Sequence, residues 1–139
     1  MDALVFHLKN IRTIRKVEWI LRIAVFGTFL GHGVFALQLK PSFLTMITAM
    51  TGISGSLAEN LLITIGVVDI ITASFAIVFP FRLMLIWAAS WGFLTALARP
   101  ISGEPVWDFI ERWANWGAPL ALLYLRGFPE KLGIKGLFR

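Results

Sequence analysis

The sequence contains no cysteine, and only two of its 139 residues are histidine. The missing thiols exclude disulfides, iron–sulfur clusters and dithiol relays within the chain. The sequence also shows no metal-ligand cluster, no phosphate-binding loop and no nucleophile–base set. We therefore expect no metal site, and we do not expect the chain to be catalytic on its own. Any redox role needs a bound cofactor or a quinone.

Apolar side chains are what the sequence has in excess. They make up 58% of the residues, and the mean hydropathy is +0.78. A soluble domain of this length cannot bury so much apolar surface, so most of it is expected to face lipid. The net charge of +5 does not indicate nucleic acid, because the basic residues gather near the two chain ends, where they meet anionic headgroups. The lipid bilayer is thus the first expected partner.

The apolar runs predict an all-α integral membrane protein that folds as one domain over residues 1–139. Four spans are predicted, over about residues 17–39, 57–79, 81–98 and 106–125. Each is close to the roughly 20 residues that cross a hydrocarbon core as a helix. The expected architecture is a four-helix bundle.

Two further segments are expected beside the spans. Residues 3–15 carry apolar side chains at helical spacing and a separate basic stripe, which predicts an interfacial amphipathic helix at the amino terminus. The segment from Ser42 to Gly55 is too polar and too short to span the membrane unaided. We predict a short helix or a re-entrant connection there, between the first and second spans.

Lysine and arginine are unevenly distributed between the two predicted membrane sides. The amino-terminal segment, the turn at Arg82 and the carboxy-terminal tail are basic, whereas only Lys40 and Arg99 flank the other side. The positive-inside rule then places both termini of this multi-pass protein in the cytoplasm. The connections that carry Lys40 and Arg99 are expected to face outward.

Polar side chains within or beside the apolar runs are the main functional signal, because such groups are costly in hydrocarbon. The topology collects most of them in the outer half of the bundle and leaves Asp69 as the deepest. A carboxylate at that depth is expected to be protonated, paired with an arginine or exposed to a cavity. The candidates for ligand or proton binding are His32, Glu59, Asn60, Asp69, Trp91, Arg99, Glu111, Arg112 and Asn115.

The spacing of these residues predicts two polar helix faces. In the fourth span, Asp108, Glu111 and Asn115 follow one another at i, i+3 and i+7, on one side of a helix. In the third span, Trp91, Thr95 and Arg99 recur every four residues and share another face. Arg99 is expected to pair with Glu111 or Asp108 between the two helices. A purely structural network of ion pairs that holds the bundle together is an equally open interpretation.

The first span contains the sequence GTFLGHG. Gly27 and Gly31 have the small-xxx-small spacing, which predicts close packing against another helix. His32 follows directly in the outer half of the span, where it could exchange a proton, contact a quinone headgroup or simply be satisfied by a neighbour. A bis-histidine haem is not expected, because the other histidine, His7, is at the opposite membrane edge.

These features resemble the DoxX-like family of small four-helix integral membrane proteins. The resemblance rests on Arg22 at the opening of the first span, on the pair His32 and Gly33 near its outer end, on four spans with both ends inside, and on the short polar segment after the first span. Where such proteins often have a lysine shortly after the histidine–glycine pair, this sequence has Ala36. The family name comes from a subunit associated with thiosulfate:quinone oxidoreduction, so the resemblance implies a quinone-linked or accessory membrane role.

Two functions remain as expectations. The first is a small accessory protein, a non-catalytic subunit or assembly partner of a larger redox or quinone-linked membrane complex, whose partners are other membrane subunits or a second copy. The small size and the glycine face favour it. The alternative is a membrane redox or transport protein with a polar pocket for a quinone, a small anion or protons. It predicts that His32, Asp69, Arg99 and Glu111 converge on one cavity.

Overall fold

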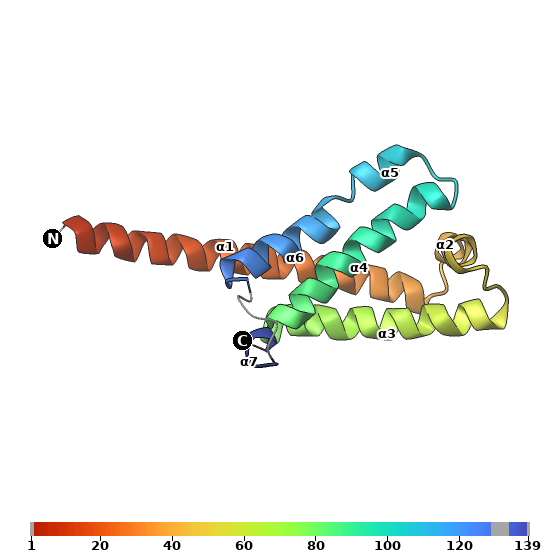
Figure 1. Cartoon of the computed structure of the whole chain (residues 1–139), viewed down its shortest axis with the longest axis horizontal. Helices are drawn as coiled ribbons and strands as arrows, with labels where there is room; N and C mark the ends of the chain where they lie inside the picture. The colour runs from red at the N-terminus through yellow and green to blue at the C-terminus, as the bar shows by residue number, and fades with distance from the viewer. Residues whose placement is uncertain (1, 129–133, 139) are drawn as a thin grey trace.

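The structure is a computed structural model that describes residues 2–128 and 134–138, with side chains described over 10–128 and 136–138. The described residues form helices and connecting turns and contain no strand, which confirms the predicted all-α class. The helices are α1 (Asp2–Leu37), α2 (Pro41–Thr51), α3 (Ser56–Val78), α4 (Arg82–Ile101), α5 (Val106–Ile110), α6 (Ala114–Leu125) and α7 (Ile134–Leu137) (Figure 1).

Three of the helices are long and apolar enough to cross a membrane. They are the Asn10–Leu37 part of α1, the whole of α3 and the whole of α4. Their bounds agree with the first three predicted spans to within a few residues, except that α1 begins earlier. These helices indicate a membrane protein.

The amino-terminal segment differs from its prediction. Residues 3–15 do not form a separate helix, because α1 continues through them without interruption to Leu37. Neither proline nor glycine occurs between residues 2 and 26, so no residue in this stretch favours a helix break. α2, in contrast, lies where a short helix or re-entrant connection was predicted.

The predicted fourth span is broken, because a turn over residues 111–113 separates α5 from α6. Arg112 donates a hydrogen bond from Nη1 to the carbonyl of Asp108 at 2.6 Å. Its backbone N–H bonds instead to the carbonyl of Phe109, three residues back, as in a tight turn. The continuous helix over 106–125, and the polar face predicted along it, are therefore wrong.

Two close contacts between backbones set how the helices pack. α1 packs along α3, and a Cβ on Gly33 or on Gly66 would lie 3.0 Å from the carbonyl oxygen of the other glycine. Gly27 and Gly31 were the predicted packing residues. Among the described residues nothing lies within 4 Å of a Cβ on either, so they make no helix contact inside this chain.

The second close contact joins α4 to α6. Pro119 has no N–H to donate to the carbonyl of Asn115, one turn earlier in α6. A Cβ on Gly92 of α4 would lie only 2.6 Å from that carbonyl oxygen. Glycine at position 92 thus makes room for a carbonyl that α6 leaves free, and it holds Asn115 beside α4.

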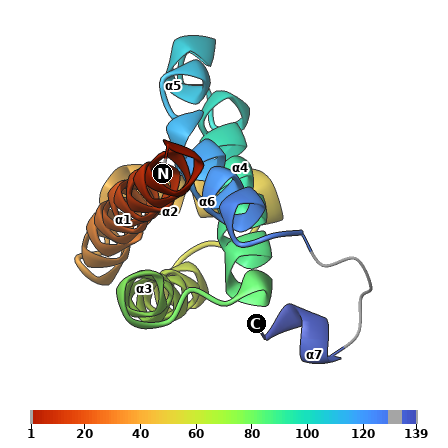
Figure 2. The same ribbon diagram turned by 90° about the vertical axis from the view of Figure 1, so that its left-hand side faces the viewer.

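The helices pack tightly at one end and separate toward the other. α3 and α4 are joined through Pro80 and diverge from there toward α2, which lies across their far ends (Figure 1). Figure 2 looks along α1 and α3 from the Pro80 side and shows α2 behind them. We call these two regions the Pro80 end and the α2 end. The core residues Ala76, Leu85 and Leu122 are fully buried at the Pro80 end.

Candidate functional site

A cavity of about 310 Å³ occupies the space where α3 and α4 diverge. Its lining comes from α1, α2, α3, α4, α6 and the turn before α6. Six of the predicted site residues contribute to it: His32, Asp69, Trp91, Arg99, Arg112 and Asn115. The structure thus brings together most of the polar residues that the sequence singled out, from segments far apart in the chain.

Three of the predicted site residues do not line the cavity. Glu59 and Asn60 are exposed near the start of α3, and Glu111 is exposed in the turn between α5 and α6. Glu111 reaches the site only through an ion pair with Arg112. The prediction that Glu111 itself lines a shared pocket is therefore wrong, because the turn over 111–113 directs it outward.

Asp69 forms the deepest polar part of the cavity. The residue is 3% exposed, and its Oδ1 has no hydrogen-bond partner among the described residues. The indole of Trp91 interacts with this carboxyl group, yet the Nε1 of Trp91 is also without a hydrogen bond that meets normal geometry. A buried polar group left unsatisfied costs about 1–3 kcal/mol. The cavity therefore contains a buried carboxyl group and an indole N–H beside it, neither of which has a hydrogen bond of normal geometry in the described structure.

The polar side chains of α4 line the cavity along its length. Trp91, Thr95 and Arg99 are spaced four residues apart, and all three contribute to the lining. This confirms the predicted polar face of the third span. At a rise of 1.5 Å per residue, the backbone positions of Trp91 and Arg99 are about 12 Å apart. The site therefore extends over roughly two turns of α4.

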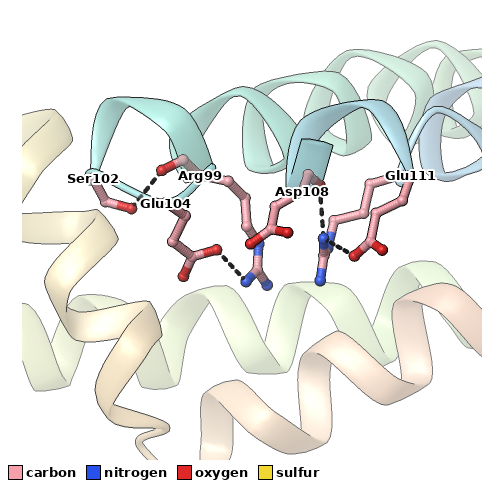
Figure 3. A network of polar contacts seen from close by, with 6 residues as sticks. Arg99, Ser102, Glu104, Asp108 and Glu111 are labelled. Carbon is pink, nitrogen blue, oxygen red and sulfur yellow. Dashed lines mark hydrogen bonds and ion pairs between the residues drawn. The ribbon is translucent and has the colours of Figure 1, made fainter. Parts of the chain in front are cut away.

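Arg99 lies at the α2 end of this face. The residue is 8% exposed, and its Nη1 donates to Oε2 of Glu104 at 2.8 Å. Figure 3 shows its side chain reaching from α4 toward α3, with the Glu104 carboxylate beside the guanidinium. The partner is not Glu111 or Asp108, as the spacing predicted. A turn at Gly103, with φ of 95°, folds Glu104 back so that its N–H bonds to the Arg99 carbonyl at 3.1 Å.

Glu104 was not predicted as a site residue. Its hydrogen bond from Arg99 lowers the pKa of the carboxyl group below its ordinary value, and the positive charge of Arg99 acts in the same direction. Glu104 is thus the negative partner of the arginine that lines the cavity. Arg112 is paired in a similar way, with the carboxylate of Glu111 and the carbonyl of Asp108. Each of the two arginines that line the cavity is therefore paired with a glutamate that does not line it.

Phe43 of α2 connects the polar groups at this end. Its ring meets the His32 ring edge to face at 6.0 Å between centroids. The Arg99 guanidinium lies 5.8 Å from the Phe43 centroid, and the Lys40 ammonium lies 5.4 Å from it. Both distances are within or close to the range of cation–π contact. Phe43 thus holds α2 against the cations and the histidine of the site.

The apolar cover of the cavity also comes from α2. Phe43, Met46, Ile47 and Met50 all line it, and their spacing of i, i+3, i+4 and i+7 is the pattern of one apolar helix face. This apolar face was not predicted, because the prediction for residues 42–55 rested on the polar residues of the segment. The same periodicity, applied to the segment of residues 42–55, is the signal that would have found this face.

Metal chemistry has no support in the described part of the chain, where no group of three or more His, Cys, Asp or Glu side chains could hold an ion. The residues present can instead enclose a mostly apolar molecule and hydrogen-bond to it at two levels, at Asp69 with Trp91 and at Arg99. His32 and Asp69 are the cavity residues that can take up or release a proton.

The structure is that of a helical protein with three candidate membrane spans and a cavity among its helices. No protein-family model, no curated protein and no solved structure matches the chain. The function is therefore argued from the site itself.

Proposed function

We propose that this chain is a small multi-pass membrane protein whose cavity binds a lipid-soluble molecule that carries a polar group. A quinone is the ligand class that we favour, with a small anion or protons as the alternatives. The observation that carries the proposal is the carboxyl group of Asp69, buried and without a partner on Oδ1, in a cavity with apolar walls. Such groups inside membrane proteins usually serve a ligand or a proton.

Size and wall chemistry support a lipid-soluble ligand. The volume of about 310 Å³ is at the lower end of the roughly 300–1,000 Å³ typical of small-molecule sites. The side chains of Ile47, Leu62 and Ile65 supply apolar wall. A quinone ring fits this description, because its carbonyl oxygens accept hydrogen bonds from donors such as Trp91 and Arg99 while its body is apolar.

Charge balance favours a neutral ligand over an anion. Arg99 is paired with Glu104, and Arg112 is paired with Glu111. The positive charge that an anion would need is therefore largely used within the protein. A proton can still be exchanged at Asp69, and this is compatible with a redox ligand that gains or loses protons.

For the topology we propose four membrane crossings, with the α5–α6 segment as the fourth and both termini in the cytoplasm. α7 and the amino-terminal part of α1 both lie toward the Pro80 end, opposite α2 (Figure 1). The exposed Arg12, Arg15 and Lys16 extend α1 beyond the core at that end, which suits the positive-inside rule and contact with headgroups. The DoxX-like resemblance, with its four spans, is part of this proposal.

The absence of cysteine makes the topology easy to test. We expect Ser54→Cys, between α2 and α3, to react with a membrane-impermeant maleimide added to intact cells. Phe128→Cys, just after α6, is expected to react only after the membrane is opened. The opposite pattern, or equal labelling of both variants, would contradict the proposed orientation.

Ligand binding can be tested with two probes of different charge, decylubiquinone and octanoate. Both are titrated into the purified protein in mild detergent, with the binding followed by tryptophan fluorescence or calorimetry. We expect decylubiquinone to bind, and we expect Ile65→Phe, which fills the cavity, to weaken it about tenfold or more. Ile63→Phe is the matched control, because Ile63 is on the same helix but is exposed and outside the cavity.

Three outcomes are informative. Loss of quinone binding in Ile65→Phe but not in Ile63→Phe supports the proposal. Binding of octanoate alone would favour the anion. Equal binding by the wild-type chain and Ile65→Phe, or no binding of either probe, would remove the case for a ligand in this cavity.

A second function, that of an accessory subunit in a larger membrane complex, is favoured by a different observation. Gly27 and Gly31 present a small-residue face with nothing within 4 Å in the described part of the chain. Another membrane helix, from a partner subunit or a second copy, can approach such a face closely. We expect Gly31→Leu to release a stoichiometric partner during purification. Gly117→Leu in α6 is the control, since that glycine is also uncrowded, and release by both variants would contradict a role for the α1 face.

A further inference from the structure

The Pro80 end contains a second group of charges, which the cavity does not use. Three arginines from different helices meet here: Arg22 of α1, Arg82 at the start of α4 and Arg126 just after α6. Glu18 lies among them and accepts hydrogen bonds on one oxygen from Arg22 at 2.9 Å and from Arg126 at 3.0 Å. We call these four residues the arginine cluster.

The arginines of the cluster also bind the carboxy-terminal ends of helices. Arg22 donates to the carbonyl of Ile77 in the last turn of α3 at 3.3 Å. Arg82 donates to the carbonyl of Arg126 and to that of Gly136 in α7, both at 3.0 Å. Helix ends carry partial negative charge, so these contacts are favourable. They satisfy carbonyl groups, but they do not neutralise a full positive charge.

Among the described side chains the cluster has a surplus of positive charge. Arg22 and Arg126 share the carboxylate of Glu18, and Arg82 contacts only backbone carbonyls, so three positive charges face one negative charge. In addition, the Nε atoms of all three arginines are buried and lack a hydrogen-bond partner in the described structure. Unbalanced charge in a low-dielectric region is costly unless a counter-charge binds. Counted over the described side chains alone, the cluster therefore has more positive than negative charge.

The place of the cluster in the fold indicates where the counter-charge comes from. It lies where α3 and α6 end and α4 begins, and in a membrane this is the level of the headgroups. The side chains of Arg22 and Arg126 are 14% and 24% exposed, so they are accessible from the surroundings. Trp19, 51% exposed, lies against the Arg22 guanidinium at 4.9 Å, and tryptophan at such an edge is typical of the membrane interface.

We propose that the arginine cluster binds the phosphate group of an anionic lipid headgroup. Arginine suits this role because its planar, permanently charged group donates several hydrogen bonds to phosphate oxygens. Basic pockets between membrane helices on the cytoplasmic side are known sites for acidic lipids. The proposal rests on the proposed membrane topology, but it does not depend on what occupies the cavity.

The test uses the full chain, delipidated in mild detergent. Phosphatidylglycerol, phosphatidylcholine and inorganic phosphate are added separately, and binding is measured by native mass spectrometry and by the shift in melting temperature. We expect phosphatidylglycerol to bind at least about fivefold more tightly than phosphatidylcholine, since about 1 kcal/mol per arginine near the membrane surface corresponds to that factor. Inorganic phosphate should not match it at equal concentration.

Variants identify the residues that bind. Arg126→Gln should reduce the preference for phosphatidylglycerol about fivefold, whereas Arg126→Lys should retain part of it. Arg12→Gln, which removes the same charge from an exposed position on α1, should leave the preference within about twofold because it lies outside the cluster.

Two results would overturn the proposal. Equal affinity for phosphatidylglycerol and phosphatidylcholine would show that the surplus charge does not recognise an acidic lipid. Inorganic phosphate binding as tightly as the lipid would assign the site to a free anion instead. If Arg126→Gln does not fold, the comparison of Arg126→Lys with Arg12→Gln decides the question. A preference for phosphatidylglycerol that is no weaker in Arg126→Lys than in Arg12→Gln would then contradict the proposal.

Discussion

The two ends of the helical bundle handle charge and space in opposite ways. At the α2 end, two arginines each have their own glutamate, Arg99 with Glu104 and Arg112 with Glu111, and a cavity lies between the helices. At the Pro80 end, Arg22 and Arg126 share Glu18, Arg82 has only carbonyl partners among the described residues, and side chains fill the space between the helices. The first arrangement suits a neutral ligand, and the second suits an anion.

Side-chain size explains the difference in packing. At the Pro80 end, Ala73, Ala76 and Ala88 are almost completely buried, and such small residues let neighbouring helices approach closely. Toward the other end, α3 and α4 separate. Met46 and Ile47 of the short helix α2 cover the gap, and no further long helix fills it in the described structure. The same set of helices thus has one tightly packed end and one end that surrounds a cavity.

The largest expected effect comes from Gly92, which anchors α6 to α4 beside the cavity. Gly92→Leu forces a side chain into the carbonyl of Asn115, since a Cβ alone would be 2.6 Å from that oxygen. Overpacking of this kind costs about 3 kcal/mol. The loss is measured as a fall in the unfolding free energy or melting temperature in detergent.

Gly117→Leu is the control for Gly92→Leu. It adds the same side chain to a helical glycine that has nothing within 4 Å in the described structure, and it should leave stability nearly unchanged. If the two variants lose equal stability, the close contact at Gly92 does not hold the α2 end together.

Asp69→Leu is expected to raise the stability of the fold and to abolish ligand binding at the α2 end. The substitution removes a buried carboxyl group that has an unsatisfied oxygen, and it should stabilise the fold by about 2 kcal/mol. At the same time the cavity should lose its ligand. Thermal unfolding together with the decylubiquinone titration checks both parts, and destabilisation with unchanged binding would mean that Asp69 is a structural residue.

Removal of one arginine from each end compares the balanced and unbalanced charges directly. Arg99→Gln leaves Glu104 without its partner, and the loss of a charged hydrogen bond should cost about 1.5 kcal/mol. Arg126→Gln leaves Glu18 still bonded to Arg22, and it also relieves surplus charge, so the cost should be under about 0.5 kcal/mol. Unfolding in a zwitterionic detergent measures the stability loss of both variants. A larger loss in Arg126→Gln than in Arg99→Gln would contradict the assigned charge balance.

The apolar runs were sufficient to locate the helices that can cross a membrane. The spacing of Trp91, Thr95 and Arg99 was also sufficient to predict which face of α4 lines the site, because a regular helix fixes which residues share a face. The position of Asp69 near the middle of an apolar run also predicted that this residue is deeply placed, and it is buried in the structure. These inferences depend only on local regularity, which the sequence encodes directly.

The predictions that failed depend on irregular backbone. The break before α6 arises because the Arg112 side chain takes a carbonyl that a helix would use, and the pairing of Arg99 with Glu104 needs the turn at Gly103. The close packing predicted at Gly27 and Gly31 stays a prediction. Within the described structure α1 packs on α3 through Gly33 instead, since a spacing pattern does not tell which helix face meets a given neighbour.

The smallest expected effect is a loss of folding stability at acidic pH, which arises at the α2 end. The hydrogen bond from Arg99 lowers the pKa of Glu104 below its ordinary value of 4.5, so the ionised form is favoured in the folded chain. Its contribution to stability is therefore present above about pH 4.5 and is lost as the pH falls through the lower pKa of the folded state. Because Glu104 is partly exposed, we expect a small drop in melting temperature on this acidic limb. Glu104→Gln should abolish that drop. Glu59→Gln should keep it, because Glu59 is exposed on α3 and Arg99 is paired with Glu104. An unchanged acidic limb in Glu104→Gln would contradict the assignment of the ion pair.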